Sequence, residues 1–146
     1  MLKKIKLDIE SIITNLDDFG LPDGDPEISR TSHAGVMRIA SDETVLSYKD
    51  SDENGSVSCN VTVRGGSVSV RRDGAICSTM LFGTDEPYKT VYSIPPYKFD
   101  MQIVTLRLDT NLSELGGKID VLYTMDVGGA KKNAKMRITV SEVQEK

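Results

Sequence analysis

The sequence predicts an all-β protein whose strands, about eight to ten of them, form a closed antiparallel up-and-down barrel. Three observations carry this prediction. Apolar residues recur at every second position through most of the chain, which is the period of a β-strand. Glycine-containing turns break these runs at intervals of about 8–12 residues, as in sandwiches and barrels. When neighbouring runs are paired across the turns, their apolar residues fall on one shared face.

Two-residue turns determine how the runs pair. Type I′ and II′ hairpin turns need positive φ at central positions, which glycine, asparagine and aspartate tolerate. The clearest turns are Asn54-Gly55, Gly65-Gly66, Asp73-Gly74 and Gly128-Gly129. As two-residue loops they place Val61 opposite Tyr48, Val63 opposite Val68, Ile119 opposite Ile138 and Tyr123 opposite Ala134. Each of these pairs joins two apolar or aromatic side chains.

Length and composition indicate one soluble domain over residues 1–146. Charged residues make up 27% and hydrophobic residues 38%, and no run approaches the ~20 apolar residues of a membrane span. The first residues mix lysines with apolar residues and lack the apolar region of a secretory signal, which favours the cytoplasm. The net charge of −4 argues against a dedicated nucleic-acid binder.

The first run alternates at Ile5, Leu7 and Ile9. A helical face is an alternative reading, but branched isoleucines favour a strand. The next stretch, at about 15–26, has no period and predicts a long loop at one mouth of the barrel. A loop of this length is either a lid or binding loop, or an ordinary surface excursion.

The run from Tyr97 to Leu108 changes the face of its apolar residues between Ile103 and Val104. Such a switch predicts a β-bulge or a sharp bend, with which barrels turn corners. Consecutive hairpins form a meander. Pairing its first strand with its last therefore closes the barrel and removes the exposed edges.

The turn at Asp73-Gly74 conflicts with the pattern that follows it. As a two-residue loop it leaves Ile76, Met80 and Phe82 on the outer face of the barrel. Three alternatives follow. The loop is bulged, or the loop at 15–26 covers these side chains, or they form a dimer or partner interface.

Arg72 shares the inner face with the valines of its strand, so its guanidinium is expected to point into the barrel. A guanidinium there needs a carboxylate, a ligand anion or solvent, because an unpaired buried charge is costly. Together with Tyr48, Tyr92 and Tyr123 it forms a candidate site for a small ligand with a carboxylate. The alternative is that Arg72 extends to solvent while the tyrosines pack.

Other catalytic or metal chemistry has little support in the sequence. His33 is the single histidine, and Cys59 and Cys77 form no C-x-x-C pair, so no zinc site is predicted. The stretch from Asp50 to Gly55 matches the first half of an EF-hand loop, but position twelve is Val61, which favours an acidic hairpin tip. No catalytic residue, metal or cofactor is therefore expected.

Barrel closure would gather basic residues of the first and last strands on one outer face. These residues are Lys4, Lys6, Lys135 and Arg137, with Lys131 and Lys132 at the adjoining tip. Phosphate backbones could use such a patch for positioning. Because no aromatic residues are interleaved, such a patch would position a nucleic acid without recognising its base sequence. The alternative is that these charges serve solubility, as charged outer faces normally do.

The segments from Arg72 to Phe82 and from Tyr92 to Met101 resemble the YwiB-like family of small bacterial β-barrels, and the ending from Gly117 onward is similar to that family too. The resemblance implies a calycin-type, lipocalin-like barrel in a family without an established activity. The chain has no tryptophan, so the G-x-W signature of secreted lipocalins is absent and their transport role is not implied.

Taken together, the sequence predicts a cytoplasmic, non-enzymatic binding module for a small, largely apolar ligand whose anionic group meets Arg72. The alternative is an interaction or dimerisation module whose barrel is filled by side chains. Cavity volume separates the two, because usual ligand sites measure about 300–1,000 Å³.

Overall fold

The computed structural model describes residues 2–52, 55–84 and 86–143. Within these residues the chain forms ten β-strands. They are β1 (Leu2–Asn15), β2 (Glu27–Ile39), β3 (Thr44–Asp52), β4 (Gly55–Arg64), β5 (Ser67–Gly74), β6 (Ser78–Phe82), β7 (Tyr88–Ile94), β8 (Tyr97–Ser113), β9 (Gly116–Val127) and β10 (Ala130–Glu142). No helix that could cross a membrane occurs in this part of the chain.

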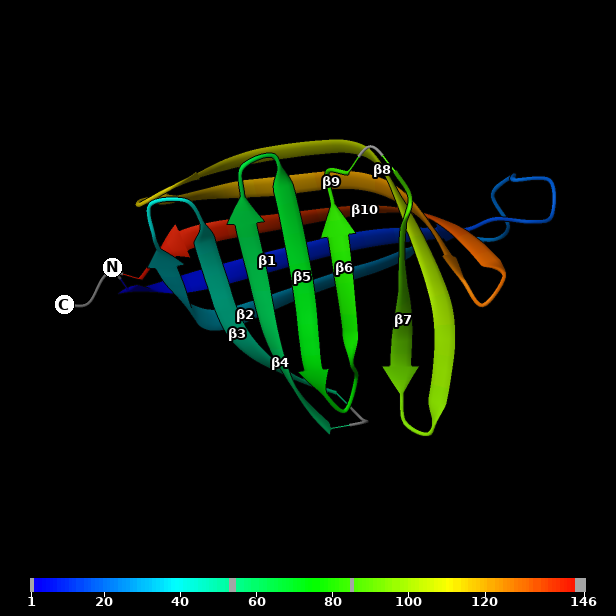
Figure 1. Ribbon diagram of the computed structural model, residues 1–146, viewed down its shortest axis with the longest axis horizontal. Coiled ribbons are helices and arrows are strands. Elements are labelled where there is room, and N and C mark those ends of the chain that lie inside the picture. The colour runs from blue at the N-terminus through cyan, green and yellow to red at the C-terminus, as the bar shows by residue number, and fades with distance from the viewer. Residues whose placement is uncertain (1, 53–54, 85, 144–146) are drawn as a thin grey trace.

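All ten strands belong to one antiparallel sheet in the order β6-β5-β4-β3-β2-β1-β10-β9-β8-β7. The first strand pairs with the last over eleven residue pairs, from Ile5 opposite Glu142 to Asn15 opposite Lys132. The predicted pairing of the first strand with the last is therefore confirmed, but the sheet keeps two edges, at β6 and β7. Figure 1 shows the sheet curling until its two edge strands, β6 and β7, face each other.

The two edge strands do not form a continuous ladder. One bridge joins them, in which Cys77 and Ser93 exchange backbone hydrogen bonds of 2.8 and 2.9 Å. We call the interval between β6 and β7 the seam. The fold is an all-β, nearly closed barrel, whose single interruption among the described strands is this seam.

Two predicted hairpin registers are confirmed and a third is displaced. Val63 pairs with Val68 across Gly65-Gly66, and Ile119 pairs with Ile138 across Gly128-Gly129. At the third turn, predicted at Asn54-Gly55, Asp52 pairs with Gly55. The connection is therefore made by residues 53 and 54, which lie outside the described part of the chain. Val61 consequently faces Leu46 rather than Tyr48. The displacement is two residues, so every side chain keeps its predicted face.

The expected outer surface at Ile76, Met80 and Phe82 is wrong. Arg72 pairs with Ser78, three residues beyond the partner that a two-residue turn would give it. A shift by an odd number turns each side chain to the other face. Phe82 and Ile76 are accordingly 0% and 8% exposed, and the half-buried Met80 packs against the core. Of the three alternatives, the longer, bulged connection is the one that occurs.

Inward-facing residues fill the barrel. The largest fully buried side chains are Phe82, Ile5, Leu7, Met37, Leu46, Ile103, Ile119, Ile138, Val61, Val68 and Val121. The predicted change of face in β8 is confirmed as a register shift between Thr105 and Arg107, which leaves Leu106 exposed and returns Leu108 to the core. This packing is the main source of stability, since burying one such side chain contributes about 1.5–3 kcal/mol.

At Gly35 the backbone of β2 lies very close to its neighbours. A Cβ atom there would lie 2.5 Å from the carbonyl oxygen of Ser47 and 2.7 Å from Cδ1 of Leu7. Both distances are shorter than a van der Waals contact, so the packing of β1 and β3 around β2 requires glycine.

We expect Gly35→Ala to lower the free energy of unfolding by about 1–3 kcal/mol, because the added methyl must displace backbone as well as Leu7. Gly66→Ala is the matched control, since nothing lies within 4 Å of its Cβ position. Urea unfolding followed by circular dichroism measures both. Equal midpoints for the two variants would contradict the steric explanation.

Candidate functional site

A hollow of about 450 Å³ lies along the seam. Residues from β5, β6, β7 and the start of β8 line it, because the seam interrupts the sheet where these strands meet. The polar lining includes Arg71, Arg72, Ser78, Thr90, Ser93 and Lys98. Cations and hydroxyl groups outnumber the one carboxylate of the lining, that of Asp73, and the size is within the range of small-molecule sites.

Arg72 lines this hollow, and the register of β5 places it on the face of the sheet that carries Val68 and Val70. It pairs with Cys59 on β4 and with Ser78 on β6, both of which are buried. Its Nε is buried and has no hydrogen-bond partner. Among the described residues no carboxylate forms an ion pair with it, whereas Arg71 on the outer face pairs with Asp73 at 3.0 Å. A guanidinium Nε without a partner is an open donor for an anion.

Ser78 supplies a second unpartnered donor in the same hollow. Its residue is 6% exposed, and its Oγ has no hydrogen-bond partner. Ser78 lies directly across the β5–β6 ladder from Arg72, so the two side chains point to the same face. Ser78 is not predicted from the sequence, because a two-residue turn at Asp73-Gly74 would place Ala75 opposite Arg72.

Two of the three predicted tyrosines lie within reach of the Arg72 charge. Burial raises the pKa of Tyr123 to about 12, and Arg72 acts in the opposite direction. Burial likewise raises the pKa of Tyr48, again against the effect of Arg72. The Tyr123 ring packs on Phe82 with ring centroids 4.8 Å apart. Tyr92 instead lies on β7, across the seam, where it pairs with Phe99 and packs against the core.

The two cysteines have different environments. Cys59 is buried, interacts with the hydroxyl of Tyr48, and has its pKa raised by burial. Cys77 is an exposed free thiol that lines the seam hollow and donates a 3.5 Å hydrogen bond to the carbonyl oxygen of Gly74. His33, on β2, packs its ring on Tyr48 with centroids 4.7 Å apart.

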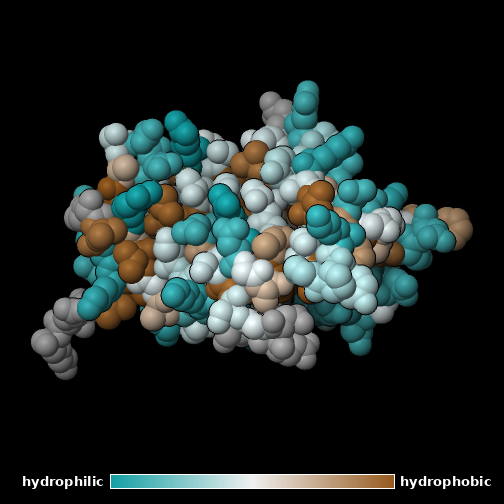
Figure 2. Space-filling view, turned by 60° about the horizontal axis from the view of Figure 1, so that its bottom comes forward, coloured by the Kyte–Doolittle hydropathy of each residue, from teal (hydrophilic) through white to brown (hydrophobic). Residues whose placement is uncertain are grey.

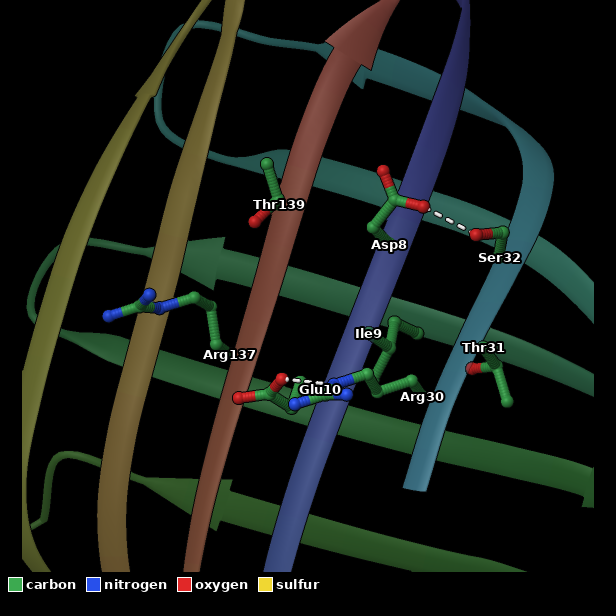
Figure 3. A pocket seen from close by; sticks show the side chains of 8 residues that line it. All are labelled: Asp8, Ile9, Glu10, Arg30, Thr31, Ser32, Arg137 and Thr139. Carbon is green, nitrogen blue, oxygen red and sulfur yellow. Dashed lines mark hydrogen bonds and ion pairs between the residues drawn. The ribbon is translucent and has the colours of Figure 1, made fainter. Parts of the chain in front are cut away.

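A second hollow, of about 330 Å³, lies on the outer face of β1, β2 and β10. Figure 3 shows its side chains standing on the three neighbouring strands. Arg30 Nε donates a 2.7 Å hydrogen bond to Glu10 Oε2, and Ser32 donates to Asp8 (Figure 3). On the far side Arg137 Nε donates a 2.6 Å hydrogen bond to Asp120 on β9.

These pairs alter the interpretation of the predicted basic strip. The strands do lie side by side, but carboxylates alternate with the cations across them: Glu10 lies opposite Arg137, and Lys6 is 3.8 Å from Asp8. The outer face therefore carries a ladder of paired opposite charges rather than a field of one sign.

Comparison with known proteins finds a matching family and a solved structure of the same architecture. The model of the family described as "Domain of unknown function (DUF1934)" matches residues 21–140. The uncharacterized beta-barrel protein YwiB of Bacillus subtilis (strain 168) is 26% identical over 129 residues, which are 88% of this chain and 86% of that protein. The crystal structure of the ywiB protein from Bacillus subtilis superposes with a TM-score of 0.85 at 25% identity, covering 98% of this chain and 94% of that chain.

We expect a thiol reagent such as dithiobis-nitrobenzoate to modify Cys77 quickly in the folded protein and Cys59 only on unfolding, because Cys59 is buried. Cys77→Ser should remove the fast phase and Cys59→Ser should keep it. A fast phase that survives in Cys77→Ser would contradict the burial of Cys59.

The ion pair in Figure 3 predicts a pH dependence. The hydrogen bond and charge of Arg30 hold the pKa of Glu10 below its ordinary value of 4.5. The pair therefore stabilises the fold above pH 4.5, and this contribution is lost as the pH falls through the lower folded pKa. In Arg30→Gln the pKa of Glu10, followed by carboxyl NMR titration, should rise. Arg38→Gln, whose partner is Glu43, should leave it unchanged.

Proposed function

The chain belongs to the DUF1934 family, and on that premise we propose that it is a non-enzymatic binding protein whose seam holds the anionic oxygen group of a small polar ligand. One observation carries the proposal: two buried donors, Arg72 Nε and Ser78 Oγ, lack partners and line the same hollow. Buried polar groups in folded proteins are almost always hydrogen-bonded, so two neighbouring exceptions call for an acceptor.

The chemistry of the hollow favours a carboxylate or phosphate group. Guanidinium and hydroxyl donors both suit charged oxygens, and the exposed Lys98 can meet a second negative charge at the outer end. Thr90 and Ser93 offer further hydroxyl groups to a polar ligand body. The ligand proposed here is thus more polar than the largely apolar one expected from the sequence, because apolar side chains fill the barrel interior.

Retaining Arg72 carries a cost in stability. The side chain of Arg72 is half-buried, and its Nε is buried without a hydrogen-bond partner. An unsatisfied buried donor destabilises a fold, so an apolar side chain of similar length can be neutral or stabilising in its place. Function is the usual reason for such a residue, since binding sites trade stability for affinity. We also propose a cytoplasmic location, with which the exposed free thiol of Cys77 is consistent, because reducing compartments keep such thiols free.

The test is binding of inorganic phosphate and of acetate, followed by calorimetry and by the shift of the thermal midpoint. Arg72→Met should bind these anions at least about tenfold more weakly than the natural chain, since a hydrogen bond to a charged group contributes ~1.5–3 kcal/mol. The same variant, without anion, should unfold at an equal or higher urea concentration.

Two further variants separate binding from general charge. Ser78→Ala should weaken anion binding with little effect on stability, because its Oγ has no partner to lose. Arg71→Gln removes a neighbouring cation that is already paired with Asp73 and should retain most of the affinity. Equal anion affinity in Arg72→Met and the natural chain overturns the proposal.

The filled interior also favours the second function, an interaction module. Its surface is not the one at Ile76, Met80 and Phe82, because these residues face inward. An interaction surface must therefore lie elsewhere on the molecule.

A further inference from the structure

The first part of β2 has a free edge. Its ladder with β1 covers residues 27–38, whereas its ladder with β3 covers only residues 35–39. In Figure 1 β2 runs toward the loop of residues 16–26, which projects beyond the barrel, and β3 diverges from it toward the lower side. Figure 2 shows the same loop projecting at the right. Among the described strands, none pairs with residues 27–34 on the side of β3.

This free edge presents backbone hydrogen-bonding groups. In an antiparallel sheet, alternate residues of a strand bond to each of its two neighbours. The N–H of Val143 donates to the carbonyl of Lys4, so even-numbered residues of β1 bond to β10 and odd-numbered ones bond to β2. Odd-numbered residues of β1 lie opposite odd-numbered residues of β2. The residues of β2 that direct their N–H and C=O groups to the free edge are therefore Ile28, Arg30, Ser32 and Ala34.

The other edges of the sheet carry devices that hinder pairing. β6 and β7 face each other across the seam. From Val104 onward β8 has no ladder on the side of β7, but it carries the register shift before Arg107 and the charged pair of Arg107 and Asp109. Residues 27–34, which read Glu-Ile-Ser-Arg-Thr-Ser-His-Ala, contain no bulge, proline or lysine. An edge without such protection is a template for another strand.

A second copy of the same edge fits this template. Two copies of one strand pair in antiparallel orientation about a two-fold axis perpendicular to the sheet. With the axis at Thr31, Arg30 lies opposite Ser32 of the second copy. Ile28 then lies opposite its Ala34, so the free length is used from end to end. An axis at Arg30 would oppose two guanidinium groups, and an axis at Ser32 would place Ile28 against a residue that already belongs to the β3 ladder.

The register centred on Thr31 also covers two exposed apolar side chains. Ile28 and Val36 stand on the outer face of β2 and are 56% and 39% exposed. Within one copy Ile28 lies beside Ile12 of β1. In the pairing it lies opposite Ala34 of the second copy and diagonal to that copy's Val36. A continuous apolar row therefore crosses the junction between the copies.

The charged side chains at the edge are complementary as well. Arg30 lies next to Ser32 of the second copy, and within each copy the Ser32 hydroxyl donates to Asp8. Each guanidinium is therefore one strand away from a carboxylate of the other copy, and no cation stands opposite it. Because these charges are exposed, salt weakens their contribution.

We propose that two copies of the chain form a two-fold symmetric dimer in which the free edges of β2 pair, so that one sheet continues through both barrels. The pairing adds about eight backbone hydrogen bonds, because each outward-directed residue exchanges two with its partner. The contact is confined to one strand, and interfaces at the low end of the size range are weak. A dissociation constant of about 1–100 μM is therefore expected.

Sedimentation velocity over a concentration series tests the dimer, for which the natural chain should show a reversible monomer–dimer equilibrium. Ala34→Glu should raise the dissociation constant at least about tenfold, because it sets a carboxylate against Ile28 of the second copy. Within one copy the new carboxylate lies opposite Lys6, so the fold should be retained. Ala40→Glu is the matched control, since Ala40 is also exposed but lies in the β2–β3 turn, outside the pairing.

Disulfide trapping tests the register in a Cys77→Ser background. The Cα atoms of a non-hydrogen-bonded antiparallel pair are about 4.5 Å apart, which a disulfide can span. Thr31→Cys should therefore cross-link to its own copy under mild oxidation. Ser29→Cys should not, but it should cross-link when mixed with His33→Cys, because these two positions lie opposite each other across the axis. Non-reducing electrophoresis measures the cross-linked fraction.

A chain that stays monomeric up to about 1 mM overturns the proposal and assigns the free edge to a strand of another protein or to none. A dimer that Ala34→Glu leaves unchanged, or cross-linking of Ser29→Cys to itself as readily as of Thr31→Cys, overturns it too. Arg72→Met should dimerise like the natural chain, so failure of the seam as a ligand site would not affect these results.

Discussion

The pairing of β1 with β10 is the constraint on which the remaining structure depends. Each strand pairs with its sequence neighbours except at the seam between β6 and β7, so without the pairing of β1 with β10 the strands would form two separate sheets, β1–β6 and β7–β10. The pairing of β1 with β10 joins them into one sheet, whose edges are β6 and β7 in the middle of the chain. The enclosed hydrophobic interior and the position of the seam both depend on that pairing.

Side-chain alternation made most of this architecture predictable. Ile119 and Ile138 were paired correctly because a two-residue turn and an apolar face pointed to the same register. The error at Asp73-Gly74 arose because Gly74 serves a different purpose from a turn. Its φ is +136°, and a Cβ there would lie 2.4 Å from the carbonyl oxygen of Ser56, so glycine allows β5 to approach β4. A sequence does not distinguish a glycine needed for a turn from one needed for contact.

The candidate site was only partly predictable from the sequence. Arg72 was placed on the inner face because the β4–β5 register was correct, whereas Ser78 depended on the β5–β6 register and was missed. The long loop at about 15–26 is predicted from its lack of period. The exposure of Phe19 could not be inferred, because it results from the hydrogen bonds that Asp17 makes within the loop. Tyr92 shares the inner face of the barrel but lies across the seam, a separation that is visible only in the strand order.

The position of the seam also has a topological consequence. Ile5 and Glu142 are cross-strand neighbours, and Val143 donates a hydrogen bond to the carbonyl of Lys4, so the two ends of the described chain lie together. A circular permutant that links these ends and is opened in the β6–β7 connection would run through the sheet strand by strand from one edge to the other. Every pairing in it would be local in sequence, including the one that now joins β1 to β10. Long-range pairings slow folding, so the natural connectivity folds more slowly than the permutant would, but it links β6 and β7 covalently across the seam.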